Sequence, residues 1–252
     1  MSILLIDIGN TRVKWAHAHG SRLGTARAAQ HAGWSAREFE RVIGPGATLE
    51  RILVASVAGP ETRSALACAA RRVHAPAPQF LAPRRRACGV TVGYLEPWRL
   101  GIDRLLAMIG ARAHFAGRPL CVVGIGTAMT LDLLGVDGRH RGGAIIPAPP
   151  LMVSSLLDAT HGIRPRARGG RTSRDPALFG RSTRAAVELG AVYAAAAAVD
   201  RAVLEARALL GRTPRVVLTG GGVRDVQPLI RGTSIEIPDL VLWGLAVWAQ
   251  EG

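Results

Sequence analysis

The sequence predicts an α/β protein composed of two similar domains. Residues 3–15 contain an apolar strand, a glycine turn and a second strand, and residues 120–134 contain the same parts in the same order. Residues 214–223 contain another apolar strand, which runs into three glycines. A repeated supersecondary unit indicates a repeated domain, and 252 residues are enough to give each of two modest domains a core.

The spacing of apolar residues predicts the elements in chain order. The run ILLI at 3–6 is typical of a buried strand, and the alternating segment RVKWAHA predicts its hairpin partner, with DIGNT at the tip. Asp239 or its neighbourhood is expected to cap the last helix. The further strand is 51–57, the helices are 61–73, 104–117, 183–210 and 238–250, and a boundary near 115–119 gives domains 1–117 and 118–252.

The chain is strongly basic, with 32 Lys and Arg residues against 18 Asp and Glu residues and a formal net charge of +14. Such a charge is compatible with nucleic-acid binding. However, the arginines are spread along the chain, and the only tight run is Arg84-Arg85-Arg86. No predicted helix is rich in base-reading side chains, and no aromatic residues interleave with arginines. A nucleic-acid partner is therefore not favoured.

The cysteines and the apolar segments indicate a compartment. The three cysteines form no CxxC pair, which argues against a disulfide framework and a zinc site and suits a reducing cytosol. The N-terminal apolar segment is short and closed by Asp7, unlike a signal peptide. The apolar stretches 191–199 and 240–249 are shorter than the roughly 20 residues that span a bilayer. We expect a cytoplasmic protein with no membrane partner.

Residues 7–14, DIGNTRVK, form the first candidate phosphate site. Gly9 lets the backbone turn tightly, so that nearby amides can point at an anion. The carboxylate of Asp7 fits such a site only with a cation such as Mg²⁺ between it and the phosphate. Lys14 is the single lysine of the chain, and its compact ammonium suits contact with one phosphate oxygen. Taken alone, the motif fits an ordinary hairpin turn with an incidental lysine almost equally well.

Two more glycine-rich loops have the same character. The segment GIGTAMT at 124–130 offers glycines with the hydroxyls of Thr127 and Thr130, and TGGG at 219–222 follows a strand, where a flat loop can lie against a nucleotide. Each motif is weak alone, because glycine turns after strands are common. Three of them in one chain, each after an apolar strand, indicate a two-domain kinase whose cleft holds ATP.

The segment GIDR at 101–104 precedes a predicted helix. Asp103 fits a helix N-cap, a common structural role. Arg104 is harder to explain, because a cation at a helix start opposes the macrodipole. An anionic ligand at this place would account for it. Asp103 would then accept a proton from a substrate hydroxyl, while Arg104 held the charge of the substrate.

These motifs together resemble the type III pantothenate kinases, a family within the acetate and sugar kinase, Hsp70 and actin superfamily. The likeness covers nearly the whole chain, from IDIGNTRVKW to PDLVLWGLA. The stretch GYLEPWRLGIDR at 93–104 is the most specific part of it, because the superfamily at large lacks this pattern.

The resemblance implies a fold and a reaction. The fold is two ribonuclease-H-like domains around a central cleft, an actin-like ATPase fold that usually assembles as a homodimer. The reaction is ATP-dependent phosphorylation of pantothenate to 4'-phosphopantothenate, the first step toward coenzyme A, with Asp103 as the base and Asp7 as the Mg²⁺ ligand. The ATP-binding candidates are Asp7, Ile8, Gly9, Asn10, Thr11, Arg12, Val13, Lys14, Gly126, Thr127, Thr130, Gly220 and Gly221. The pantothenate-binding candidates are Tyr94, Gly101, Ile102, Asp103, Arg104 and Thr183.

Two positions depart from the family pattern. The family usually has Asp where this chain has Gly124, and that Asp is associated with an activating monovalent cation such as K⁺ or NH₄⁺. The family also tends to have Gly where this chain has Ala148. The sequence therefore leaves the dependence on a monovalent cation open.

Two other functions stay open at this point. One branch of the family is described as accessory factors for gene transcription, which would give salt-sensitive nucleic-acid binding without turnover. A kinase for another small hydroxylated acid would need the same residue types.

Overall fold

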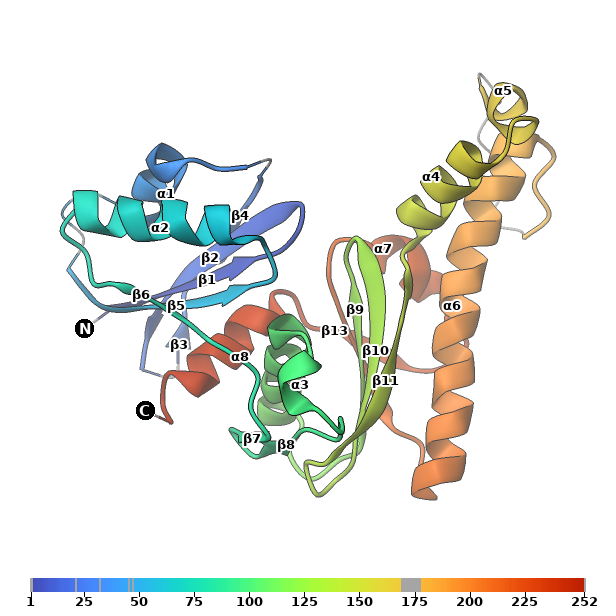
Figure 1. Cartoon of the computed structure of the whole chain (residues 1–252). Coiled ribbons are helices and arrows are strands. Elements are labelled where there is room, and N and C mark those ends of the chain that lie inside the picture. Colours follow the sequence, from blue (N-terminus) through green and yellow to red (C-terminus); the bar gives the residue numbers. More distant parts are fainter. Residues whose placement is uncertain are drawn as a thin grey trace. The chain divides into compact units, whose positions relative to one another are not determined.

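The computed structural model describes residues 2–20, 22–31, 33–44, 46, 48–168 and 178–251. The chain forms two compact units (Figure 1). Unit 1 comprises Met1–Gly117, Leu134–Gly142 and Asp239–Gly252, and unit 2 comprises Arg118–Leu133 and Gly143–Pro238. The first segment of unit 1 ends at Gly117. The segments 134–142 and 239–252 belong to unit 1 by their contacts, although they follow residue 118 in the sequence.

Unit 1 is built on a six-stranded sheet with the order β3-β2-β1-β5-β6, in which β4 also pairs with β2. The predicted hairpin is present, since β1 and β2 are antiparallel, whereas β5 runs parallel to β1 and to β6. The strands are β1 (Ser2–Ile8), β2 (Arg12–His19), β3 (Arg22–Leu23), β4 (Arg27–Gln30), β5 (Leu49–Ser56) and β6 (Pro78–Phe80).

Helices cover both faces of this sheet (Figure 1). On one face, α1 (Ala36–Ile43) and α2 (Pro60–Arg72) pack their apolar residues against alternate residues of β1 and β5. A capping box between Ser35 and Glu38 starts α1. On the other face lie α3 (Ile102–His114) and α8 (Leu240–Trp248), which contact the strands and each other.

The helices α3 and α8 approach each other at backbone distance because each has a glycine at the contact. A Cβ atom on Gly110 would lie 2.5 Å from the carbonyl oxygen of Leu240, and one on Gly244 would lie 2.0 Å from that of Leu106. Any side chain at either position would push the helices apart. The two glycines therefore allow the close contact between α3 and α8 in unit 1.

Unit 2 repeats the arrangement with a five-stranded sheet of order β11-β10-β9-β12-β13. As in unit 1, the first strand of the unit is central and has a parallel neighbour, β12. The repeat in the sequence is therefore a repeat of the sheet topology. The strands are β9 (Leu120–Ile125), β10 (Ala128–Leu134), β11 (His140–Pro147), β12 (Arg215–Thr219) and β13 (Ser234–Glu236).

The long helix α6 (Thr183–Leu210) covers one face of this sheet, and Ala195, Ala196 and Val199 lie in the core of the unit. The described part of the chain has no helix long and apolar enough to cross a membrane. The remaining elements are β7 (Arg86–Ala87), β8 (Val90–Thr91), α4 (Pro149–Ala159), α5 (Ile163–Ala167), α7 (Val223–Val226) and the 3₁₀ turns η1 (Pro97–Arg99) and η2 (Gln227–Leu229).

Candidate active site

The hairpin of β1 and β2 presents the first candidate residues in unit 1. Asp7 and Lys14 are direct partners across the hairpin. The tip is closed by the amide of Gly9, which donates to the carbonyl oxygen of Arg12 at 2.9 Å. The sequence reasoning missed His31. Its Nε2 forms a hydrogen bond with the carbonyl oxygen of Gly9 at 2.8 Å, which helps to hold the hairpin tip in place. Ile8 and Val13 are fully buried in the core, so only their backbone groups are available to a ligand.

Asp7 has an unusual electrostatic environment. Its pKa is raised from 3.8 to about 7, chiefly because burial disfavours the charged form and because the carboxylate of Asp103 lies nearby. Lys14 lowers this pKa and Asp239 raises it. Asp7 therefore interacts electrostatically with two other carboxylates and with one ammonium group. This brings the predicted base, Asp103, close to the predicted phosphate-binding hairpin within the same unit.

Asp239 corrects the capping prediction for the last helix. It occupies the N-cap position of α8 but makes no side-chain capping bond, and its φ of 54° lies in the left-handed region. Its side chain instead accepts a hydrogen bond from Nζ of Lys14, with 2.8 Å between Nζ and Oδ1. A strained backbone at a polar cluster is common at functional sites. The ammonium group of Lys14 has three N–H donors, so it can donate to a phosphate oxygen while it keeps its bond to Asp239.

The start of α3 gathers the candidate substrate-binding residues of unit 1. Gly101 occupies the N-cap position, so Asp103 lies in the first turn and is not the cap. A Cβ atom on Gly101 would lie 2.4 Å from Oδ1 of Asp103, so a side chain there would displace the carboxylate. Ile102 is buried beneath them. Arg104 is 5% exposed, and its Nη1 donates to the hydroxyl of Tyr94 at 2.9 Å.

Tyr94 has a second aromatic neighbour that the sequence reasoning missed. The imidazole of His140, at the start of β11, stacks on the Tyr94 ring with 5.6 Å between centroids and 26° between planes. These residues are 46 positions apart in the sequence, and no local pattern connects them. The predicted residues Tyr94, Asp103 and Arg104 and the unpredicted His140 thus belong to one part of unit 1.

In unit 2, the two glycine-rich loops lie side by side. Gly124 and Thr219 are direct partners on the parallel strands β9 and β12, so both loops leave the sheet at its carboxyl edge. Gly220 has a φ of 108°, and a Cβ atom on it would lie 2.3 Å from the carbonyl oxygen of Ile125. Only glycine permits that approach. The predicted residues Gly126, Thr127, Gly220 and Gly221 therefore lie on adjoining loops, as ligand-binding loops of α/β sheets commonly do.

The predicted Thr130 lies beside Gly124. A Cβ atom built on Gly124 would be 2.9 Å from the hydroxyl oxygen of Thr130. The threonine side chain therefore occupies the space that a larger residue at 124 would use. An aspartate there would have to displace this hydroxyl.

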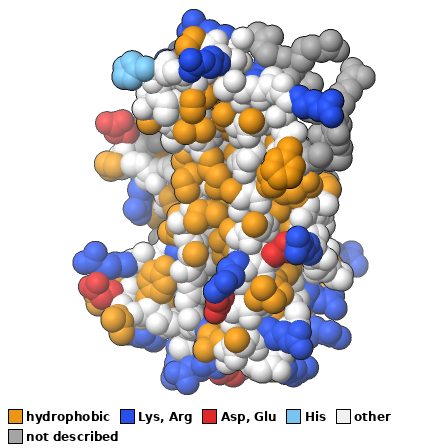
Figure 2. All heavy atoms as spheres, turned by 90° about the vertical axis from the view of Figure 1, so that its right-hand side faces the viewer, with side chains coloured by type: hydrophobic (Ala, Val, Ile, Leu, Met, Phe, Trp, Pro, Cys, Tyr) orange, Lys and Arg blue, Asp and Glu red, His pale blue; other side chains and the backbone are white. Residues whose placement is uncertain are grey.

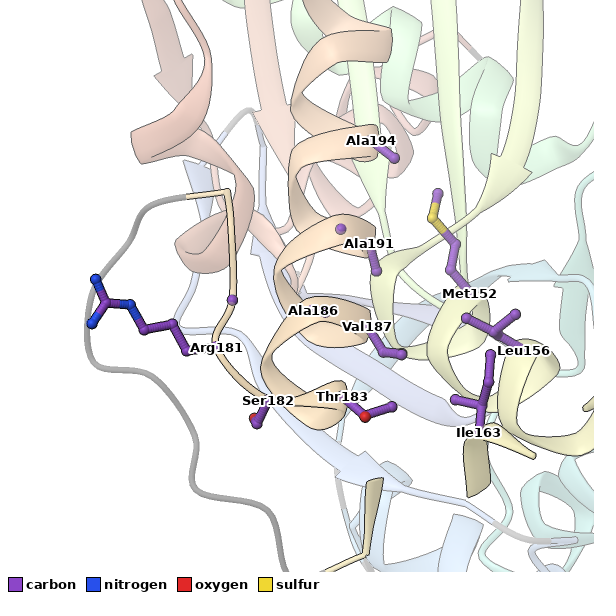
Figure 3. Close-up of a pocket in the computed structure, with 12 residues that line it drawn as sticks. Met152, Leu156, Ile163, Arg181, Ser182, Thr183, Ala186, Val187, Ala191 and Ala194 are labelled. Carbon is purple, nitrogen blue, oxygen red and sulfur yellow. The ribbon is translucent and has the colours of Figure 1, made fainter. Parts of the chain in front are cut away.

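Thr183, the remaining substrate-binding candidate, lies in unit 2 at the first turn of α6. It lines a cavity of about 930 Å³ between α6 and the α4–α5 segment. Figure 3 shows Leu156 and Ile163 on the side facing Val187 of α6 and Met152 extending toward Ala194, while the side chain of Arg181 points away. Ser182 caps the helix by accepting a hydrogen bond from the amide of Ala185. Apolar side chains form most of this cavity, and Thr183 and Ser182 supply hydroxyl groups at one end.

A magnesium ion fits the donor chemistry around Asp7. Within the described residues, no group of three His, Cys, Asp or Glu side chains could by itself hold a metal ion. Mg²⁺ in phosphoryl-transfer sites typically needs only one or two carboxylates, because substrate phosphates and water complete its shell. The pKa of Asp7 is raised chiefly by burial and then by the charge of Asp103, and a bound cation would favour the charged carboxylate again.

Comparison with known proteins identifies the family. The chain is 37% identical to a type III pantothenate kinase of Stenotrophomonas maltophilia (strain K279a) over 99% of its length and 98% of that protein. It is 35% identical to a type III pantothenate kinase of Nitrosococcus oceani over 99% of its length and 94% of that protein.

Solved structures establish the fold. A Baf family transcriptional activator from Campylobacter jejuni aligns with a TM-score of 0.58 at 20% identity, covering 98% of each chain. A ROK family glucokinase from Streptomyces griseus, in complex with glucose and AMPPNP, aligns with a TM-score of 0.52 at 13% identity, covering 100% of each chain. These likenesses show a two-domain α/β fold of the actin-like ATPase type. A model of one family matches residues 3–205, and the chain belongs to that family, the type III pantothenate kinases.

Proposed function

We propose that this chain phosphorylates pantothenate with ATP, giving 4'-phosphopantothenate and ADP, the first step toward coenzyme A. One observation carries the proposal: the carboxylate of Asp103 lies near enough to Asp7 to raise its pKa, so a base stands beside a hairpin suited to phosphate. Membership of a family named for pantothenate supports the choice of substrate. The transcriptional alternative is not favoured, because the likeness to the Baf protein is at 20% identity and concerns the fold alone.

In the proposed reaction, Asp103 accepts the proton of the primary hydroxyl of pantothenate. The oxygen then forms a bond to the γ-phosphorus while the bond to the bridging oxygen of ADP breaks. Lys14 and the amides near Gly9 bind phosphate oxygens, and Arg104 binds the carboxylate of pantothenate. Asp7 would hold Mg²⁺, which would neutralise phosphate charge. Positioning and charge stabilisation supply most of the rate in such reactions.

A coupled ADP-release assay tests this function directly. With Mg²⁺ and ATP present, we expect ADP release that requires pantothenate and one equivalent of phosphorylated product per ADP. Absence of product with pantothenate, together with turnover on another small hydroxy acid, would identify a different substrate. ADP release without any acceptor would overturn the kinase assignment.

We also propose that turnover does not depend on potassium or ammonium. The residue at 124 is glycine, and the hydroxyl of Thr130 lies where a side chain at 124 would go. A cation site therefore lacks the carboxylate that the family pattern supplies. We expect equal rates in matched sodium, potassium and ammonium buffers. The variant Gly124→Asp is the matched comparison, and we expect potassium to stimulate it. Wild-type activity that needs potassium would contradict the proposal.

A second copy of the chain is the proposed cover for the apolar face of α4 and α6. Figure 2 shows hydrophobic side chains gathered on this side of the molecule. Leu156 on α4 is 40% exposed. Contiguous exposed apolar patches usually mark interaction sites, and two-fold homodimers are the commonest oligomers. We expect sedimentation at twice 26.6 kDa. Leu156→Arg should give monomers, whereas Leu209→Arg at the far end of α6 should not.

We place the reaction in the cytoplasm. The three cysteines, Cys68, Cys88 and Cys121, are all free thiols in the structure. Free thiols without disulfides are typical of reducing compartments, which supports this placement.

A further inference from the structure

Tyr94 is held by two side chains that come from different parts of unit 1. Arg104, from the first turn of α3, donates to its hydroxyl at 2.9 Å and has its guanidinium carbon 5.6 Å from the ring centroid. His140 stacks on the ring of Tyr94, with 26° between the planes. His140 is 2% exposed and Arg104 is 5% exposed, so both contacts are shielded from water.

The backbone of His140 lies very close to the backbone just before Tyr94. A Cβ atom on Gly93, the residue before Tyr94, would lie 2.0 Å from the carbonyl oxygen of His140. The turn before His140 is held against residue 91, because the amide of Thr91 donates to the carbonyl oxygen of Gly138 at 2.9 Å. A Cβ atom on Gly138 would lie 2.2 Å from the carbonyl oxygen of Gly89. Glycines on both sides thus let the turn of residues 135–138 press against residues 89–93.

We propose that His140 is a positioning residue for the acidic substrate: by stacking on Tyr94 it fixes the tyrosine whose hydroxyl orients the guanidinium of Arg104. The proposal rests on the proposed function, in which Arg104 binds the carboxylate of pantothenate. In this proposal, His140 contacts neither the hydroxyl oxygen of pantothenate nor the γ-phosphorus of ATP. Its effect passes through Tyr94 to Arg104, and so concerns substrate binding and not proton transfer.

His140 would affect substrate binding because the side chain of Arg104 can adopt many conformations. An arginine side chain has several rotatable bonds, and ordering it costs conformational entropy. The hydroxyl of Tyr94 selects one orientation, but only if the Tyr94 ring is itself held. The flat face of His140 supplies that restraint through ring stacking, which stabilises aromatic pairs beyond the area that they bury. Loss of the stack should therefore weaken substrate binding while leaving the chemical step available.

Two variants of His140 separate positioning from simple packing. His140→Ala removes the ring, and we expect the KM for pantothenate to rise roughly 10-fold, as pre-organisation is lost, with kcat and the KM for ATP within about twofold of wild type. His140→Phe keeps a flat ring and should restore the KM for pantothenate. His114→Ala is the matched control. His114 packs on the ring of Trp243 in the same unit, so this variant should reduce stability without raising the KM for pantothenate.

A second readout does not need turnover. The chain has only two tyrosines, Tyr94 and Tyr193, so ring signals of selectively labelled tyrosine can be assigned with a Tyr94→Phe variant. We expect His140→Ala to shift the Tyr94 ring signals and His140→Phe to leave the ring ordered. Unchanged Tyr94 signals in His140→Ala would overturn the proposal. So would a KM for ATP that rises as much as that for pantothenate.

Failure of the proposed function would look different. A wild-type chain that does not phosphorylate pantothenate would contradict the function. The tyrosine spectrum would still decide whether His140 orders Tyr94. If the Tyr94 signals move in His140→Ala while pantothenate binding by calorimetry is unaffected, the stack exists but positions nothing, and the inference is wrong.

Discussion

Asp103→Asn is expected to lower kcat by roughly 100-fold or more, the usual cost of removing a general base. The amide has nearly the same size as the carboxylate but cannot accept the proton of the attacking hydroxyl. The variant should fold, because Asp103 does not cap α3 and a neutral group there removes repulsion from Asp7. Steady-state rates with saturating ATP and pantothenate give kcat, and circular dichroism melting checks the fold.

The control for this variant is Asp225→Asn, an aspartate exposed on unit 2. It changes the net charge of the chain by the same amount and should leave kcat unaltered. Full activity of Asp103→Asn would show that another group takes the proton. An equal loss of kcat in both variants would show that the change in net charge, and not the loss of a general base, lowers the rate.

Asp7→Asn is expected to abolish turnover and yet to stabilise the fold at neutral pH. The pKa of Asp7 in the folded protein is about 7, against 3.8 for the ordinary group. Between these two values the folded chain holds a proton that the unfolded chain has released. The contribution of Asp7 to the free energy of unfolding therefore falls as pH rises through this window and is lowest above pH 7. Asparagine carries no charge at any of these pH values, so the free energy of unfolding of the variant should lack this fall with pH.

The size of this effect can be bounded. A shift of about three units corresponds to roughly 4 kcal/mol as an upper limit. Because part of the Asp7 side chain contacts solvent, we expect a gain of about 2 kcal/mol at pH 8 in magnesium-free buffer. Urea unfolding of both proteins at pH 5 and pH 8 measures it. A variant that is less stable than wild type at pH 8 would show that Asp7 is satisfied in its charged form.

The strands and both hairpins could be predicted because their information is local. The runs ILLI and LCVVGI are apolar on both faces, as central strands of covered sheets are, and glycine turns follow them. The same strand order in both units follows from that repeat. Helix ends were less accurate. The helix expected from residue 104 begins at Ile102, since Gly101 and not Asp103 holds the cap position.

The contacts that hold the site together could not be predicted from local pattern. Lys14 and Asp239 are 225 positions apart, and their ion pair exists because α8 returns to the sheet of unit 1. Asp239 has the residue type of a good cap, but its left-handed backbone turns the side chain toward Lys14. His140 reaches Tyr94 because the turn of residues 135–138 packs against residues 89–93, and no periodic pattern in the sequence indicates this contact. Such contacts depend on tertiary packing, which outweighs local preference.

The contact of α3 with α8 has a consequence for how the protein is made. Domains generally fold from the N-terminus as the chain leaves the ribosome. Here the first unit needs the last helix to be synthesised, because α8 fills one face of its sheet and carries the partner of Lys14. A nascent chain halted before residue 239 would have its second unit entire and its first unit unfinished. Asp239 must therefore have been synthesised before the predicted phosphate-binding lysine has its counter-ion.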